Sequence, residues 1–145
     1  MVNLTLKGQS SADTGFVYSV IIPAYNEEDY LPSTLSSLHS AMDSIPHKGE
    51  IIVVDNNSTD NTRHVAEKYG ARVVFEPFRQ IAKARNSGAK AAKSNFLVFL
   101  DADTMLPPQL LQKSLMLLEK IFQATTDLQH PILKRSLKLI EYFLY

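Results

Sequence analysis

The chain has 145 residues, of which 45% are apolar, so it can bury the core of one domain but not of two. Fifteen basic and fifteen acidic residues cancel, which argues against a nucleic-acid partner that would need a strongly basic surface. The absence of cysteine excludes a disulfide framework and zinc sites built from thiolates.

The N-terminal segment does not have the pattern of a targeting signal. Residues 1–16 are mostly polar and contain no continuous apolar run, so we interpret them as a flexible leader. No stretch of the sequence is long and apolar enough to span a membrane. We therefore expect a cytoplasmic protein, whose only membrane contact would be peripheral, at the inner face.

From residue 17 onward, short apolar runs alternate with amphipathic segments. The apolar runs, rich in β-branched and aromatic residues, predict strands. They cover residues 17–22, 51–54, 72–76 and 96–100. The segments between them repeat apolar residues every three or four positions, which predicts helices. The helices are expected over Leu31–Met42, from Ser58–Asp60 to Tyr69, over Ile81–Lys93 and from Pro107 onward.

Strands separated by helices imply right-handed crossovers. The fold class is therefore α/β, a mainly parallel sheet with helices on both faces. Ligands of such sheets bind outside the carboxyl ends of the strands, so the loops that follow the strands are the candidate site. Three of these loops are polar, namely residues 23–27, 55–60 and 101–104. No glycine-rich loop follows any strand, which argues against a nucleotidyltransferase or a dinucleotide oxidoreductase.

The third loop carries two carboxylates, Asp101 and Asp103, directly after an apolar strand. In extended chain, side chains two residues apart point the same way, and two like charges at a sheet edge favour a bound cation. Oxygen ligands suit Mg²⁺ or Mn²⁺, which would bridge a diphosphate and neutralise charge on the leaving group. The alternative is that Asp103 and Thr104 cap the helix that follows at Pro107.

The second loop offers hydrogen-bonding groups to a nucleotide. Asp55 and Asn56 could contact a nucleobase or a ribose through their carboxylate and amide groups. The alternative is helix capping, which we expect for Ser58, Thr59 and Asp60 in either case.

Basic residues in the segment 79–88 could contact phosphate oxygens beside a metal. Arg85 is the better candidate, because a guanidinium can grip two oxygens at once. Lys83 fits a solvated helix face at least as well.

These segments together resemble the inverting family 2 glycosyltransferases of the GT-A fold. The matching motifs are Tyr18–Glu28, Val53–Asp60, Ala84–Gly88 and Phe99–Thr104, in the family's order and spacing. The resemblance covers roughly residues 17–120. It implies a GT-A-like, Rossmann-like sheet, a nucleotide-diphosphate sugar as donor, a divalent metal, and an acceptor that could be a saccharide, a lipid or a protein.

The resemblance also implies roles for individual residues. Pro23, Tyr25 and Glu27 would lie near the nucleotide, and Asp55 would contact the base. Asp101 would lie by the ribose and the metal, and Asp103 would be the metal ligand.

The sequence departs from the family pattern at two places. Asn56 stands where the family often has a second aspartate, which affects base preference rather than binding. After Thr104 the only acids are Glu119, Asp127 and Glu141, and none lies in a recognisable base motif, so no catalytic base is assigned. Asp127 is expected in a polar linker. We expect a metal-dependent glycosyltransferase that moves a sugar from a nucleotide-diphosphate donor to an unknown acceptor. The chain could be a truncated transferase or a natural fragment, and the alternative function is a non-catalytic nucleotide-sugar-binding module.

The predicted organisation is a leader over 1–16, a nucleotide-sugar-binding GT-A core over 17–120, and a linker with an amphipathic helix over 121–145. That helix would begin at Pro131. It could pack on its own domain, pack on a second subunit of a homo-oligomer, or lie at a membrane interface.

Overall fold

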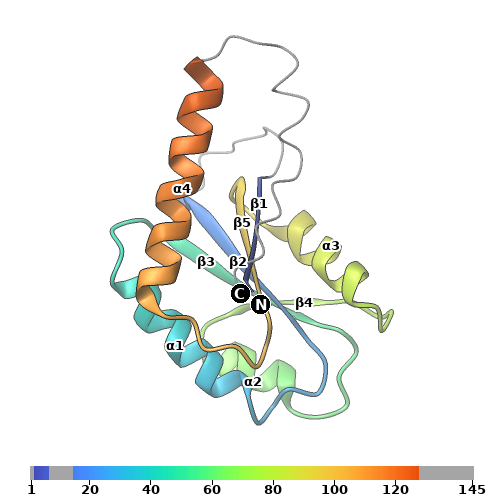
Figure 1. Cartoon of the computed structure of the whole chain (residues 1–145). Coiled ribbons are helices and arrows are strands. Elements are labelled where there is room, and N and C mark those ends of the chain that lie inside the picture. Colours follow the sequence, from blue (N-terminus) through green and yellow to red (C-terminus); the bar gives the residue numbers. More distant parts are fainter. Residues whose placement is uncertain (1, 7–14, 128–145) are drawn as a thin grey trace.

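A five-stranded sheet forms the centre of the molecule in the computed structural model, which describes residues 2–6 and 15–127 (Figure 1). The strand order is β1-β5-β2-β3-β4, and all neighbours are parallel except β1, which runs antiparallel to β5. The strands are β1 Val2–Leu6, β2 Tyr18–Ala24, β3 Gly49–Asp55, β4 Arg72–Phe75 and β5 Phe96–Leu100. The predicted α/β fold with a mainly parallel sheet is confirmed.

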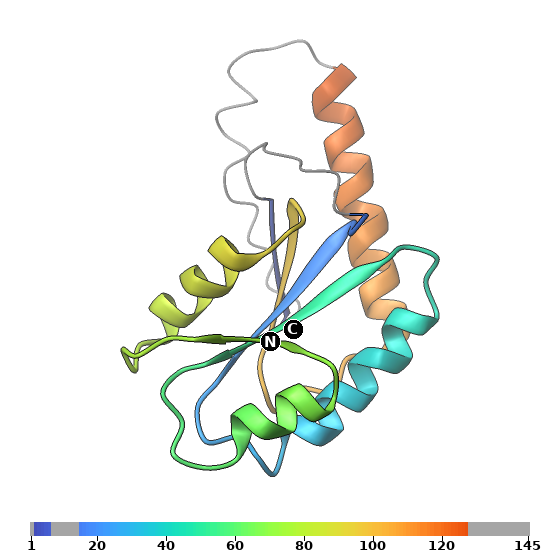
Figure 2. The same ribbon diagram turned by 180° about the vertical axis from the view of Figure 1, so that it is seen from behind.

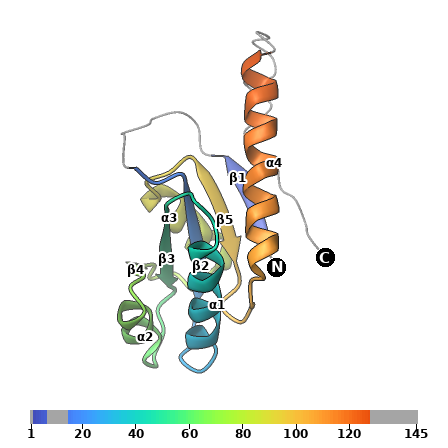
Figure 3. The ribbon, with the colours of Figure 1, turned by 90° about the vertical axis from the view of Figure 1, so that its left-hand side faces the viewer.

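Helices cover both faces of the sheet (Figures 2 and 3). They are α1 Leu31–Asp43, α2 Thr62–Lys68, α3 Ile81–Ala91 and α4 Pro108–Asp127. Leucines of α1 and α4 share one buried cluster with Val20, Ile22 and Val53 of the strands, and Ala66 of α2 belongs to the same cluster. The other face packs on α3, through Ile21, Ile52 and Val54 among others. Alternate residues of each central strand therefore serve opposite cores, which is why these strands are continuously apolar.

The helix α3 lies unusually close to the sheet. A Cβ atom added to Gly88 would meet Cγ2 of Ile21 at 2.4 Å and Cγ2 of Val54 at 2.9 Å. Glycine at this position lets the helix backbone sit on the β-branched side chains of β2 and β3, and the alanines of α3 serve the same purpose.

Two parts of the structure differ from the sequence prediction. The segment 1–16 was expected to be a flexible leader, and this is wrong for residues 2–6, which form β1 and pair with β5 along the whole length of that strand. The alternation of apolar and polar residues in Val2–Leu6 fits a strand, but five residues were too few to stand out.

The helix α4 is longer than predicted and runs to Asp127, so the expected boundary at residue 120 falls inside it. Asp127 is the last residue of this helix rather than part of a polar linker. The helix predicted from Pro131 lies outside the described residues. Within the described residues, no helix is long and apolar enough to cross a membrane.

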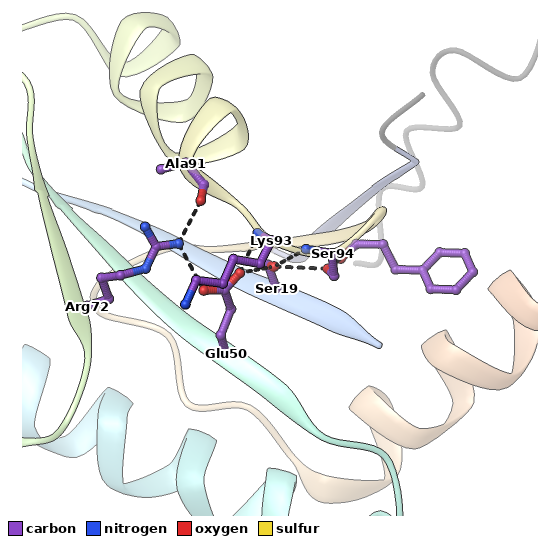
Figure 4. Close-up of polar contacts among 7 residues, drawn as sticks. Ser19, Glu50, Arg72, Ala91, Lys93 and Ser94 are labelled. Carbon is purple, nitrogen blue, oxygen red and sulfur yellow. Dashed lines mark hydrogen bonds and ion pairs between the residues drawn. The ribbon is translucent and has the colours of Figure 1, made fainter. Parts of the chain in front are cut away.

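A buried polar network holds the amino ends of the strands (Figure 4). The carboxylate of Glu50 accepts hydrogen bonds from Ser19 Oγ at 2.7 Å, Lys93 N at 2.6 Å and Arg72 Nη2 at 2.9 Å. Arg72 also donates to the Ala91 carbonyl, at 2.6 Å, and thereby ties β4 to the end of α3. This network lies at the opposite end of the strands from the loops that follow them. Its role is to tie the strands and α3 together.

Candidate functional site

The loops after β2, β3 and β4 form one continuous surface at the carboxyl ends of the strands, which we call the ligand edge. Backbone hydrogen bonds join these loops to each other. Asn56 N donates to the Ala24 carbonyl at 2.8 Å, and Glu76 N donates to the Asp55 carbonyl at 2.9 Å. The register pairs Ala24 with Asp55 and Asp55 with Phe75. The residue Asn56 therefore lies between the loop of β2 and the loop of β4.

The loops after β2 and β3 are held together by side chains. Asn26 has a φ of 55°, a left-handed conformation that asparagine tolerates well. Its Oδ1 accepts from Thr59 N at 2.8 Å, and its own N donates to Ser58 Oγ at 3.1 Å. Ser58 and Thr59 were predicted as helix caps, which is wrong, because α2 begins later, after Asn61. They instead fix the loop that carries Tyr25 and Glu27.

Asp60 joins the same two loops. Its Oδ1 accepts from Thr62 N at 3.0 Å, in the manner of a cap, and its Oδ2 accepts from Glu28 N at 3.2 Å. Partial burial alone would raise the pKa of Asp60, but the hydrogen bonds from Thr62 and Glu28 outweigh it and lower the pKa. The carboxylate of Asp60 therefore stays negatively charged beside Glu27.

The predicted base-binding pair, Asp55 and Asn56, is buried, with 5% and 6% of the residue surface exposed. Asp55 Oδ1 accepts a hydrogen bond from Ser58 N at 2.9 Å, so this carboxylate shapes the turn after β3. The Oδ1 atom of Asn56 is buried and has no hydrogen-bond partner among the described residues. A buried carbonyl oxygen without a donor is costly.

The two carboxylates after β5 lie on a turn rather than on extended chain. The strand ends at Leu100, and the Asp101 carbonyl accepts from Thr104 N at 3.1 Å, which closes the turn. The expectation that Asp101 and Asp103 follow the strand in an extended conformation is therefore wrong. The alternative capping role of Asp103 is not favoured either, because α4 begins only at Pro108.

The turn brings Asp103 to the acidic side of the site. Partial burial, followed by the nearby charges of Asp103 and Asp60, raises the pKa of Glu27. The described residues contain no group of three or more protein ligands that could hold a metal alone. A magnesium-type ion takes one or two carboxylates and completes its shell with substrate phosphates, so a single carboxylate of this turn could hold such an ion together with a diphosphate.

Arg85 of α3 faces this turn. Its Nη2 lies 3.6 Å from Asp101 Oδ1, and its guanidinium lies 5.7 Å from the centroid of the Phe99 ring. The Nε atom is buried without a hydrogen-bond partner among the described residues. Lys83, the weaker candidate, lies elsewhere, with Nζ 3.6 Å above the Phe78 ring.

Arg79 was not singled out from the sequence, and the structure places it beside Tyr25. Its guanidinium lies 4.8 Å from the centroid of the Tyr25 ring, and both residues are exposed. The loop that carries Arg79 is joined to the β3 loop, because Asn57 Nδ2 donates to the Pro77 carbonyl at 3.3 Å. Pro23, in contrast, is buried within β2, so it can contribute only backbone to a ligand. Arg79 stood in a basic segment, but nothing in the sequence linked it to Tyr25.

A hollow lies beside α1. Its lining residues are Pro32, Ser33, Ser36, Ser37, Ser40, Tyr69 and Met105, and none of them is a predicted site residue.

The geometry defines an α/β domain with a polar, partly acidic ligand edge at the carboxyl ends of its strands. The model of the family described as glycosyl transferase family 2 matches residues 19–130. The chain therefore belongs to family 2 of the glycosyltransferases, and the resemblance seen in the sequence is confirmed. The match extends ten residues past the predicted core, consistent with the longer α4.

Known proteins support this membership in sequence and in structure. An uncharacterized glycosyltransferase of Mycobacterium bovis is 35% identical over 118 residues, which cover 81% of this chain and 51% of that protein. The chain thus spans about half the length of this relative. Residues 1–349 of S. aureus TarS, solved with UDP-GlcNAc, match with a TM-score of 0.64 and 31% identity over 72% of this chain and 32% of that one.

A mannosyltransferase from Pyrobaculum calidifontis, solved with GDP-Man and Mn²⁺, matches with a TM-score of 0.57 and 26% identity, over 70% of this chain and 32% of that one. The structural relatives are GT-A glycosyltransferases, so the predicted GT-A-like fold is confirmed.

Proposed function

We propose that this chain binds a nucleotide-diphosphate sugar and a divalent metal, and serves the transfer of the sugar to an acceptor. The observation that carries the proposal is the buried Oδ1 of Asn56, which lacks a donor and lies between the β2 and β4 loops. Nucleobases such as uracil and guanine present ring N–H groups that could donate to it once the loops that bury this atom move apart. Tyr25 and Arg79 offer flat groups beside it, and Asp55 holds the turn that presents it.

The diphosphate would lie on the opposite side of the ligand edge from the nucleobase, beside the loop that follows β5. Arg85 contacts Asp101 there, Asp103 lies two residues further along the same turn, and a bound Mg²⁺ or Mn²⁺ would neutralise charge on the departing diphosphate. Glu27 adds a further negative charge near Asp103, which favours a cation at this place. The Mn²⁺ in the structure of the Pyrobaculum mannosyltransferase supports a divalent ion without fixing which one this chain uses.

The transfer is expected to invert the sugar configuration, as the sequence resemblance implies. A base must then activate the acceptor hydroxyl from within hydrogen-bond reach. We assign no base to this chain, and the acceptor, whether saccharide, lipid or protein, stays open. The alternative is a module that binds the nucleotide sugar without transferring it. Robust sugar transfer by the purified chain would exclude it.

Binding of a nucleotide panel tests the proposal most simply. UDP, GDP, ADP and their sugar conjugates would be titrated into the chain by calorimetry, with Mn²⁺, with Mg²⁺ and with EDTA. We expect one base to bind more tightly than the others and the affinity to fall when EDTA removes the metal. No binding of any nucleotide in any condition would overturn the proposal.

A further inference from the structure

The residue that follows β4 is a buried acid at the start of an exposed loop. Glu76 is 8% exposed, whereas residues 77–80 are all exposed and belong to neither a helix nor a strand. We call residues 77–80 the β4–α3 loop, after the two elements that it joins (Figure 1). This loop carries Arg79, whose guanidinium lies against the Tyr25 ring. A carboxylate is rarely buried unless its oxygens are satisfied, so the partners of Glu76 indicate its role.

Both carboxylate oxygens of Glu76 accept hydrogen bonds. Oε1 accepts from Phe78 N at 3.0 Å, within the loop, and Oε2 accepts from Ser87 Oγ on α3. The backbone N of Glu76 donates to the Asp55 carbonyl at 2.9 Å, at the end of β3. A single residue thus ties the β4–α3 loop to the neighbouring strand and to the helix that follows.

The bond from Phe78 to Glu76 also determines where Arg79 lies. The Phe78 carbonyl accepts from Gln80 N at 2.7 Å, and a bond between residues two apart closes a tight turn with Arg79 at its centre. Phe78 therefore supplies the carbonyl that closes this turn and the N–H that Glu76 holds. The backbone of Arg79 is fixed through Phe78 by Glu76.

The other contacts of the loop are weaker. The Pro77 carbonyl accepts from Asn57 Nδ2 at 3.3 Å in an exposed position, and Lys83 Nζ lies 3.6 Å from the centroid of the exposed Phe78 ring. Hydrogen bonds to a buried carboxylate are stronger than such solvent-exposed contacts. The main hold on the loop is therefore Glu76.

We propose that Glu76 is a positioning residue that keeps Arg79 against Tyr25 at the ligand edge. The consequence for nucleotide binding rests on the function proposed above, whereas the hold on Arg79 is a property of the free chain. An arginine side chain has many rotamers, and ordering it on binding costs affinity. A guanidinium already placed beside Tyr25 avoids that cost. Because Glu76 is buried and both its carboxylate oxygens are bonded, it acts through Arg79 and not on the ligand.

Proton NMR of the free chain tests the hold on Arg79 without any ligand. Protons above the face of an aromatic ring are shielded, so side-chain protons of Arg79 should resonate upfield of their usual positions. Tyr25→Leu identifies this shift by removing the ring. Glu76→Ala should abolish most of the shift, while the methyl resonances of Ile21 and Val54, in the core under α3, stay in place.

The conservative variant Glu76→Gln should keep the shift. Its amide oxygen can accept from Phe78 N, and its amide N–H can donate to Ser87 Oγ, because a hydroxyl oxygen also accepts. If Glu76→Ala does not fold, Ser87→Ala replaces it in the test. That variant removes one of the two carboxylate bonds and should lose part of the shift.

Calorimetry of UDP and GDP binding with Mn²⁺ tests the consequence for the nucleotide. Arg79→Ala should weaken binding about two- to fivefold, the contribution of an arginine over a ring at an exposed site. Glu76→Ala should weaken it by a similar factor. The double variant should bind no more weakly than Arg79→Ala alone, because Glu76 acts through Arg79. Glu76→Gln should bind as tightly as the unaltered chain.

The matched control is Glu67→Ala, at an exposed glutamate of α2 whose carboxylate lies 3.0 Å from Arg63 Nε. It should change neither the Arg79 resonances nor the affinity. An unchanged upfield shift in Glu76→Ala, or a loss of affinity that adds fully to that of Arg79→Ala, would overturn the proposal. If the unaltered chain bound neither nucleotide, the proposed function would fail, and the resonances of the free chain would still decide whether Glu76 holds Arg79.

Discussion

Replacing Asn56 by leucine separates the binding role of this residue from any structural role. The carbonyl oxygen of Asn56 is buried and has no donor among the described residues, so it makes the free protein less stable. Removal of such an unsatisfied acceptor recovers about 1–3 kcal/mol, provided that the new side chain fits. For a chain of this length, that gain would raise the melting temperature by about 3–10 °C.

The same replacement should weaken nucleotide binding. Without the acceptor, the donor N–H of the base would be buried and unpaired, at a cost of about 1–3 kcal/mol, or about 5- to 150-fold in the dissociation constant. Calorimetry of UDP and GDP binding and thermal unfolding of the free chain would measure the two effects. Asn56→Ala should lose the same affinity, and it covers the case in which leucine is too large for the site.

The control is Asn61→Ala, at an exposed asparagine whose side chain makes no cap hydrogen bond to α2. It should change neither the melting temperature nor the affinity beyond a few tenths of a kcal/mol. The reasoning is refuted if both Asn56 variants bind nucleotide as tightly as the unaltered chain. If both variants lower the free energy of unfolding by as much as they lower the free energy of nucleotide binding, Asn56 is a structural residue and its binding role is refuted.

Three further predictions concern other parts of the molecule. Asp103→Ala should abolish the metal dependence of nucleotide affinity, and unchanged metal-dependent affinity in calorimetry would contradict its role as a ligand. Glu50→Gln should lower the free energy of unfolding by about 1–3 kcal/mol, because it breaks the pairing with Arg72. Burial alone would raise the pKa of Glu50, but its hydrogen bonds lower the pKa overall, so its contribution is complete above about pH 4.3 and is lost as the pH falls further. Urea titrations at pH 7 and pH 3 should therefore show a smaller difference in the variant. Gly88→Ala should cost about 1–3 kcal/mol, because the new methyl group would meet Ile21, and an unchanged urea midpoint would contradict this packing.

The central strands could be predicted because their pattern has a single physical explanation. A run such as Ile51-Ile52-Val53-Val54 is buried on both faces of a parallel sheet, and few other positions tolerate it. The position of Asp55 and Asp101 at the carboxyl ends of β3 and β5 followed from the same reasoning, because parallel strands end on the same side of the sheet.

Other features depend on contacts that a sequence pattern does not encode. The turn at Asp101 replaces an extended chain because of one backbone bond to Thr104. Helix α4 continues through Thr125 and Thr126 to Asp127, since a helix already formed extends more easily than single-residue propensities suggest. The stacking of Arg79 on Tyr25 joins two loops that are far apart in the chain, and the unpartnered oxygen of Asn56 is visible only once its neighbours are placed.

The most direct test of the central claim is a crystal structure of the chain with UDP or GDP and Mn²⁺, whichever nucleotide the titrations select. The account predicts the base with a ring N–H donating to Asn56 Oδ1 and the diphosphate beside Arg85, with the metal on Asp103. A nucleotide bound elsewhere, for example in the serine-lined hollow on α1, or a base that leaves Asn56 Oδ1 without a donor, would contradict it.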